Sequence, residues 1–177
     1  MSDAAKKTAA TPGLGTTLAS IVNGCFGDYL SQRDNGLAID MAFYRNNRPL
    51  PLTPETLREA FPAPTSKLCV LVHGLCCHEG AWDYPDNPAR SYGSALQDEL
   101  GYTPFFLRYN TGLPIPYNGT ALDALLEKLL AAYPLDVEEL VLVGHSMGGL
   151  VLRGACHFGA ERGATWVGKV KRVFYIG

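Results

Sequence analysis

One serine in this sequence stands in a setting that favours nucleophilic chemistry. It lies in the string Gly144-His145-Ser146-Met147-Gly148-Gly149. The string follows an apolar run that predicts a buried strand over 139–143, and it precedes residues 147–162, whose spacing predicts a helix. A serine in so sharp a strand-to-helix turn has a strained backbone, and its neighbours two residues away must lack side chains. Gly144 and Gly148 meet that condition. The alternative is an ordinary glycine-rich turn with a buried serine cap.

The predicted surroundings of Ser146 also favour developing negative charge. In an open α/β sheet, a hydroxyl at this turn projects from the carboxyl end of the strands, where such sheets bind ligands. The N-terminus of the following helix lies directly behind it and carries a partial positive charge. We therefore expect Ser146 to act as a nucleophile.

The elements around Ser146 alternate in a rhythm that predicts a parallel sheet with helices on both faces. Strands are predicted at 68–72, 103–109, 139–143 and 170–176, and helices at 91–100, from Asn118 as cap to 133, and 147–162. An antiparallel hairpin is predicted before them, with strands at 38–44 and 49–52, followed by a short helix capped by Thr53. Residues 1–13 are predicted to be a flexible tail. Residues 14–177 are predicted to form the N-terminal part of a single domain, and residues 14–33 have helical spacing.

Composition excludes several classes of function. The chain has 177 residues, 47% of them apolar, and a net charge of −2 with no basic run, which gives no electrostatic case for nucleic acid. No apolar stretch reaches the ~20 residues that span a bilayer. No secretory signal is visible, so we expect a cytoplasmic protein with reduced cysteines; a secreted or peripheral membrane form stays open.

With these motifs in hand, the sequence resembles the α/β-hydrolase superfamily, specifically its lipase and esterase branches. The resemblance rests on His73-Gly74-Leu75 after the strand 68–72 and on the Gly-His-Ser-Met-Gly-Gly string, which also occurs in bacterial hydrolases similar to GPI inositol-deacylases. It covers residues 38–177. It implies that the backbone N–H groups of Leu75 and Met147 hold an oxyanion, supported by His73, Gly74, Gly144, His145 and Gly148. It also implies ester hydrolysis through an acyl-enzyme, without a metal or an organic cofactor.

The remaining polar and aromatic candidates have simpler interpretations. His73 is expected to organise its loop and His145 to be structural. His78 and Glu79 are expected in a solvent-exposed loop, and His157 is expected to pack partly buried on its helix. For two aromatic residues, a wall of an acyl pocket and packing of the loop stay equally open: Trp82 and Tyr84.

The sequence departs from the family pattern in its triad. The family order is Ser, then an acid, then His, on later strands. After Ser146 the chain contains only His157 and Glu161, from which no triad can be built. We therefore expect a fragment, lacking the last strands and at least roughly 60 residues, with an exposed apolar sheet edge. The substrate is expected to be a small-molecule or lipid ester, and the oligomeric state stays open. Alternatives are a degenerate, non-catalytic binding module or, among enzymes, an acyltransferase, a thioesterase or a peptidase.

Overall fold

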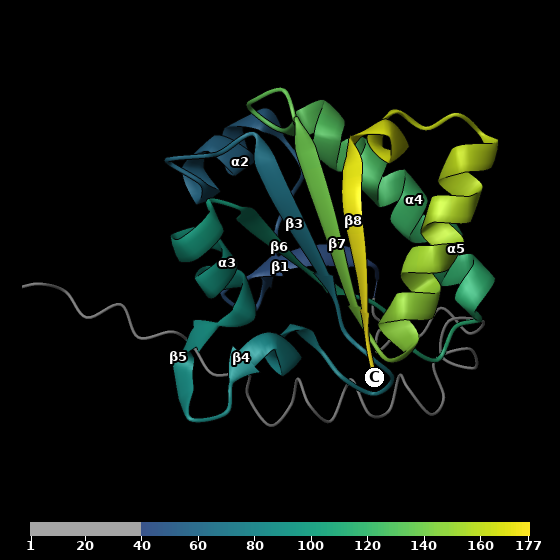
Figure 1. Ribbon diagram of the computed structural model, residues 1–177, viewed down its shortest axis with the longest axis horizontal. Coiled ribbons are helices and arrows are strands. Elements are labelled where there is room, and N and C mark those ends of the chain that lie inside the picture. The colour runs from purple at the N-terminus through teal and green to yellow at the C-terminus, as the bar shows by residue number, and fades with distance from the viewer. Residues whose placement is uncertain (1–39) are drawn as a thin grey trace, which may run out of the picture.

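A six-stranded, mostly parallel sheet forms the centre of the molecule (Figure 1). The computed structural model describes residues 40–177, so the predicted tail and the helix over 14–33 lie outside the described residues. The strands run in the order β2-β1-β6-β3-β7-β8. Their bounds are Ala42–Arg45 (β1), Arg48–Pro49 (β2), Lys67–Val72 (β3), Thr103–Arg108 (β6), Glu139–His145 (β7) and Val170–Ile176 (β8). Strands β3, β6, β7 and β8 are parallel, and β1 and β2 are antiparallel, as the sequence predicts.

The register of the central strands brings the two sequence motifs together. Val72 at the end of β3 is the partner of Gly144 in β7. The chain leaves β3 towards β6 on one side and leaves β7 towards β8 on the other side. The boundary between β3 and β7 is therefore the topological switch point, where open sheets bind ligands beyond the carboxyl ends of their strands.

Successive side chains of the strands point to opposite faces of the sheet and pack into two separate hydrophobic cores, one on each face. Leu68, Val70 and Val72 belong to the larger core, together with apolar residues of α4 (Ile115–Ala132) and α5 (Met147–Glu161). Cys69 and Leu71 face the smaller core, against which Leu96 of α3 (Tyr92–Leu100) packs. Helices therefore cover both faces, as predicted (Figure 1). Among residues 40–177, no helix is long and apolar enough to cross a membrane.

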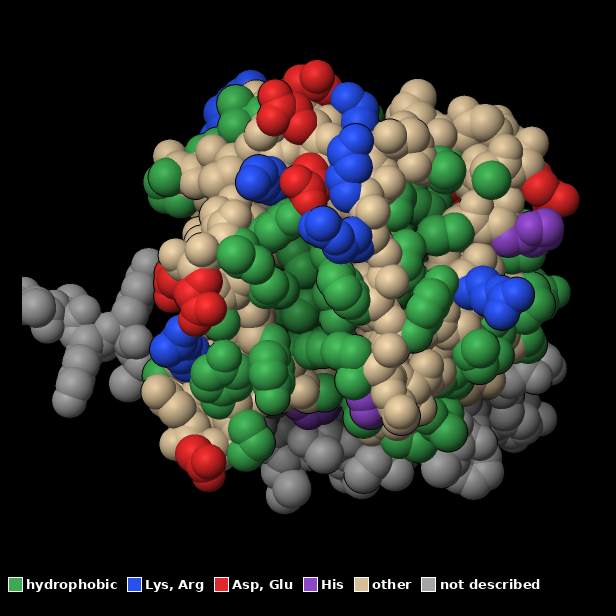
Figure 2. Space-filling model, viewed as in Figure 1, with side chains coloured by type: hydrophobic (Ala, Val, Ile, Leu, Met, Phe, Trp, Pro, Cys, Tyr) green, Lys and Arg blue, Asp and Glu red, His purple; other side chains and the backbone are tan. Residues whose placement is uncertain are grey.

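The face that carries α3 is only partly covered. A hollow of about 340 Å³ lies beside α3, with Trp82, Val143 and Phe174 among its walls. Figure 2 shows apolar side chains gathered on this face. At the neighbouring edge, Phe174, Tyr175 and Ile176 of β8 are exposed, so the predicted exposed apolar sheet edge is present.

Helix ends follow the predicted capping residues in two cases and depart from them in a third. Thr53 caps α2 (Pro54–Ala60) by accepting a hydrogen bond from Thr56 N. Helix α3 ends at Gly101, whose φ is 72°. The prediction that Asn118 caps α4 is wrong, because the helix begins at Ile115 after Pro114. The buried Asn118 side chain instead donates to the backbone oxygens of Asn110 and Leu113 and ties the preceding loop to the helix.

The structure differs from three further expectations. The second hairpin strand is only Arg48–Pro49, because proline cannot extend the ladder of hydrogen bonds. Glu79 is not exposed: it pairs with the guanidinium of Arg108. His157 is exposed, 3.6 Å from Glu161 one helical turn away. A small antiparallel ribbon that the sequence did not predict is formed by β4 (Asp83–Tyr84) and β5 (Asn87–Ser91). The 3₁₀ helix η1 (Glu79–Trp82) leads into it.

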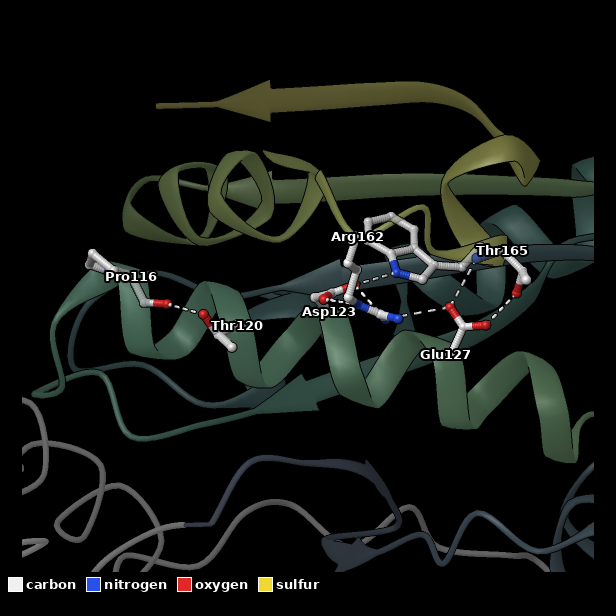
Figure 3. A network of polar contacts seen from close by, with 7 residues as sticks. Pro116, Thr120, Asp123, Glu127, Arg162 and Thr165 are labelled. Atoms are coloured by element: carbon white, nitrogen blue, oxygen red, sulfur yellow. Dashed lines mark hydrogen bonds and ion pairs between the residues drawn. The ribbon is translucent and has the colours of Figure 1, made fainter. Parts of the chain in front are cut away.

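A buried carboxylate joins α4 to the end of α5 and to the 3₁₀ helix η2 (Thr165–Lys169) (Figure 3). Asp123 accepts hydrogen bonds from Arg162 Nε at 2.6 Å and Trp166 Nε1 at 2.7 Å. One turn along α4, Glu127 accepts from the backbone N–H of Thr165 at 3.1 Å. Burial alone would raise the pKa of Asp123, but the hydrogen bonds from Arg162 and Trp166 outweigh it and hold that pKa below its usual range.

We expect Asp123→Asn to lower the free energy of unfolding by about 1–3 kcal/mol at pH 7, because the buried Trp166 N–H and the exposed Arg162 guanidinium lose a charged acceptor. A carboxyl with a lowered folded-state pKa stabilises above its unfolded pKa of 3.8 and loses that contribution as the pH falls through the folded value. The difference between variant and wild type should therefore shrink below pH 3.8. Urea unfolding at several pH values measures it. Glu127→Gln, at the more exposed end of the network, is the matched control and should cost less.

Candidate active site

Ser146 occupies the sharp turn between β7 and α5. The strand ends at His145 and the helix begins at Met147, so Ser146 alone connects them. Its φ is 51° and its ψ is −124°, a backbone conformation that residues other than glycine rarely adopt. The Ser146 N–H donates to the carbonyl oxygen of Ile176 in β8 at 2.7 Å, and the residue is exposed. This is the strained, accessible geometry that the sequence motif requires.

Two glycines make this turn possible because backbone segments touch there. A Cβ atom on Gly144 would lie 2.7 Å from the backbone N and Cα of Gly149. A Cβ atom on Gly148 would lie 2.3 Å from Val72 O and 2.6 Å from His73 O. The first turn of α5 therefore packs directly on the ends of β3 and β7, and no side chain fits between them.

The loop after β3 lies against Ser146. A Cβ atom on Gly74 would lie 3.1 Å from both Ser146 Cβ and His145 Nδ1. Next to this contact, the Leu75 N–H makes no hydrogen bond within residues 40–177. Met147 is the first residue of α5, so its N–H lacks an acceptor within the helix. The two amides predicted to act as oxyanion donors thus flank Ser146 with their donor capacity unused in the described part of the chain.

His73 holds the loop from inside the protein. Its side chain is fully buried and stacks on Tyr109, with ring centroids 4.6 Å apart. Nδ1 lies 3.0 Å from Gly74 O, and because a carbonyl only accepts, Nδ1 carries the proton. The Tyr109 hydroxyl donates to His73 O at 2.8 Å. Since Gly74 O and Leu75 N–H belong to one planar peptide, fixing the oxygen also fixes the direction of the N–H.

Because it is buried, His73 cannot act as a general base at neutral pH. Burial lowers the pKa of His73 to about 4, against smaller opposing effects of the Gly74 hydrogen bond and the nearby Glu79. Its second nitrogen, Nε2, is buried and has no hydrogen-bond partner in the described residues. His73 is therefore a neutral imidazole with one donor engaged.

Further contacts that the sequence analysis missed hold the far side of this loop. Cys76 has a φ of 58°, and its N–H donates to Thr111 Oγ1 at 3.1 Å. The Cys77 N–H donates to Gly74 O at 3.3 Å and closes a tight turn around Leu75. Thr111 lies three residues after the end of β6. The sequence could have indicated its contact with the loop after β3, since the carboxyl ends of neighbouring parallel strands lie side by side.

The other polar and aromatic candidates have local roles. His78 caps η1 by accepting from Gly80 N at 3.0 Å, and His157 lies on α5 about three turns from Ser146. In residues 40–177, no histidine or carboxylate forms a hydrogen bond with the Ser146 side chain. Trp82 is buried in the smaller core, and Tyr84 packs edge-on against Tyr92. Within the same part of the chain, no group of three or more His, Cys, Asp or Glu side chains could hold a metal ion.

A hollow of about 330 Å³ opens beside the serine, between the first two turns of α5 and Tyr175 of β8. Its walls are Ser146, Gly149, Leu150, Arg153 and Tyr175. Trp82 and Tyr84 do not line this hollow, which favours the packing interpretation for both.

Comparison with known proteins agrees with this architecture. Residues 69–176, more than half of the chain, match the model of the alpha/beta hydrolase family. The chain therefore belongs to the alpha/beta hydrolase family, and a hydrolase in general is the class that its fold supports. No curated protein and no solved structure matches the chain.

We expect the free energy of unfolding to depend on pH through His73. A histidine with a lowered folded-state pKa is neutral when folded and protonated when unfolded between pH 4 and 6.5. Stability is therefore complete above pH 6.5 and falls by about 3 kcal/mol as the pH drops through this window. His73→Phe keeps an aromatic ring on Tyr109 and removes the titrating group, so urea unfolding from pH 7.5 to 4 should show a flatter profile.

The matched control for this measurement is His157→Gln, which removes an exposed imidazole and should keep the wild-type profile. An equally steep profile in His73→Phe would contradict the assignment of the pH dependence to His73.

Proposed function

We propose that this protein is a serine hydrolase that cleaves carboxylic esters through an acyl-enzyme on Ser146. The observation that carries the proposal is the strained, exposed Ser146 with two unused backbone donors beside it. Backbone strain of this kind costs on the order of 1–3 kcal/mol and persists at sites where function uses it. An ordinary serine cap is a poorer explanation, because no side-chain capping hydrogen bond is made by Ser146 at the start of α5.

The proposed reaction has two steps. The Ser146 hydroxyl attacks the ester carbonyl carbon and gives its proton to a base, and the Leu75 and Met147 N–H groups donate to the oxyanion that forms. The C–O bond to the alcohol then breaks, and the alcohol leaves with the proton. Water releases the acid from the serine in the second step. Acyltransferase, thioesterase and peptidase chemistry share the first step and differ in the leaving group and the acceptor.

The proposal requires an imidazole at Ser146 that residues 40–177 do not supply. His73 is buried and engaged with Gly74, His78 caps η1, and His157 lies three turns away. His145 precedes the serine and lies against Gly74. We therefore propose that the base and its acid come from outside the described residues.

The intact mass of the protein isolated from its own cells tests this requirement. The 177 residues have a mass of 19.1 kDa. A larger mass would be consistent with a base and an acid on the same polypeptide. A mass near 19.1 kDa would contradict ester hydrolysis and favour a non-catalytic binding module of the same fold.

Ser146→Ala should abolish hydrolysis of a short-chain nitrophenyl ester while leaving the protein folded. Loss of a serine nucleophile lowers kcat by up to ~10⁶-fold in serine hydrolases, so activity should fall to background. Circular dichroism and urea unfolding provide the folding control. Retained hydrolysis in the folded variant would overturn the assignment of Ser146.

A further inference from the structure

An arginine lines the same hollow as the proposed nucleophile. Arg153 and Ser146 are both walls of the 330 Å³ hollow along α5, together with Gly149, Leu150 and Tyr175. Arg153 is exposed, and within residues 40–177 no carboxylate lies within ion-pair distance of it. No acidic residue lines the hollow. A cationic group therefore faces this space without a protein counter-charge in the described part of the chain.

The helix geometry explains why both residues line one space. Gly149 and Leu150 lie four and three residues before Arg153 in α5, so the three share one side of the helix, and that side leads to Ser146 at the helix N-terminus. Helical Cα–Cβ bonds tilt towards the N-terminus, so the Arg153 side chain leaves the helix in the direction of Ser146.

The other walls of the hollow offer apolar surface against which the methylene groups of a ligand could pack. Leu150 and Tyr175 are exposed and present apolar surface. Gly149 leaves the space for the Tyr175 ring, because a Cβ atom there would lie 2.9 Å from Tyr175 Cδ1. A ligand bound along this face would meet the serine at one end, apolar walls in the middle and a guanidinium at the other end.

From this arrangement we infer that the preferred substrate is an ester with an anionic group joined to the reacting carbonyl by a short apolar chain, recognised by Arg153. The inference rests on the proposed ester hydrolysis and names its substrate class. Guanidinium groups bind carboxylates and phosphates by paired, charge-assisted hydrogen bonds. Both anions fit this chemistry, and the acyl or the alcohol part of the ester can carry them.

Matched nitrophenyl esters test the inference on the protein isolated from its own cells and on its variants. One series carries a terminal carboxylate, from the half-ester of succinate to that of suberate. The second has the same chain lengths with the carboxylate capped as a methyl ester. A third set, acetate esters of phosphate-bearing alcohols, tests the alcohol side. The measured quantity is the ratio of kcat/KM for the charged ester to kcat/KM for its neutral counterpart.

We expect this ratio to exceed ten at the best chain length and to fall in 0.5 M salt, which screens an exposed charge pair. Arg153→Gln should lower the ratio at least tenfold, and Arg153→Lys should restore part of it. Arg58→Gln, which removes an exposed arginine on α2 outside the hollow, is the matched control and should leave the ratio unchanged. An unchanged ratio in Arg153→Gln would overturn the inference, and so would a wild-type ratio near one whether the acyl or the alcohol part carries the charge.

A second measurement separates this inference from the proposed function. If the wild type cleaves none of the esters, the proposed hydrolysis is wrong, and calorimetric binding of monomethyl adipate to the same isolated protein decides the inference by itself. A Kd at least tenfold weaker in Arg153→Gln than in the wild type would support an anion subsite. Equal affinities, or no binding to the wild type, would overturn it.

Discussion

The contact between the first turn of α5 and the ends of β3 and β7 is the constraint on which the candidate site depends. At Gly148 the helix backbone lies so close to Val72 O and His73 O that even a methyl group would overlap them. This approach fixes the turn at Ser146 and places the loop after β3 beside it. Because the contact is made by backbone atoms, it leaves little freedom in the position of the serine relative to the Leu75 and Met147 amides.

His73 transmits the packing of the core to this loop. Its ring is held between Tyr109 and the polypeptide of its own loop, and its proton on Nδ1 is directed at Gly74 O. The Cys77 N–H reaches the same oxygen from the other side. The orientation of the 74–75 peptide is thus set by groups that belong to the fold. Preorganised donors of this kind lower the cost of reorganisation when negative charge develops, which is how oxyanion holes act in hydrolases.

The sequence predicts the sheet and the two motifs well because their signals are local. Continuous apolar runs mark β3 and β7, and Gly101 marks the end of α3 by its left-handed conformation. The misses concern polar residues whose environment depends on distant partners. Glu79 is only partly exposed because Arg108 of β6 pairs with it, and Asn118 lies inside α4 because its side chain donates back to Asn110 O. His157 is exposed because α5 turns that side away from α4 and the sheet. The local sequence around each of these residues does not reveal which distant residue it will contact.

The distribution of backbone strain separates structural turns from the candidate site. Of the residues other than glycine with positive φ in the described range, Asn46 and Asn47 form the β1–β2 hairpin turn, which asparagine tolerates. The other two are Ser146 and Cys76, one in each loop of the candidate site. Glycine would relieve the strain at both positions, as it does at Gly101. Replacing Ser146 by glycine would also remove the hydroxyl group. The strain at this position is therefore consistent with a requirement for the hydroxyl. At Cys76 the backbone N–H is held by Thr111, which keeps the turn around Leu75 closed, and the strain is thus confined to the residues that orient the two amides.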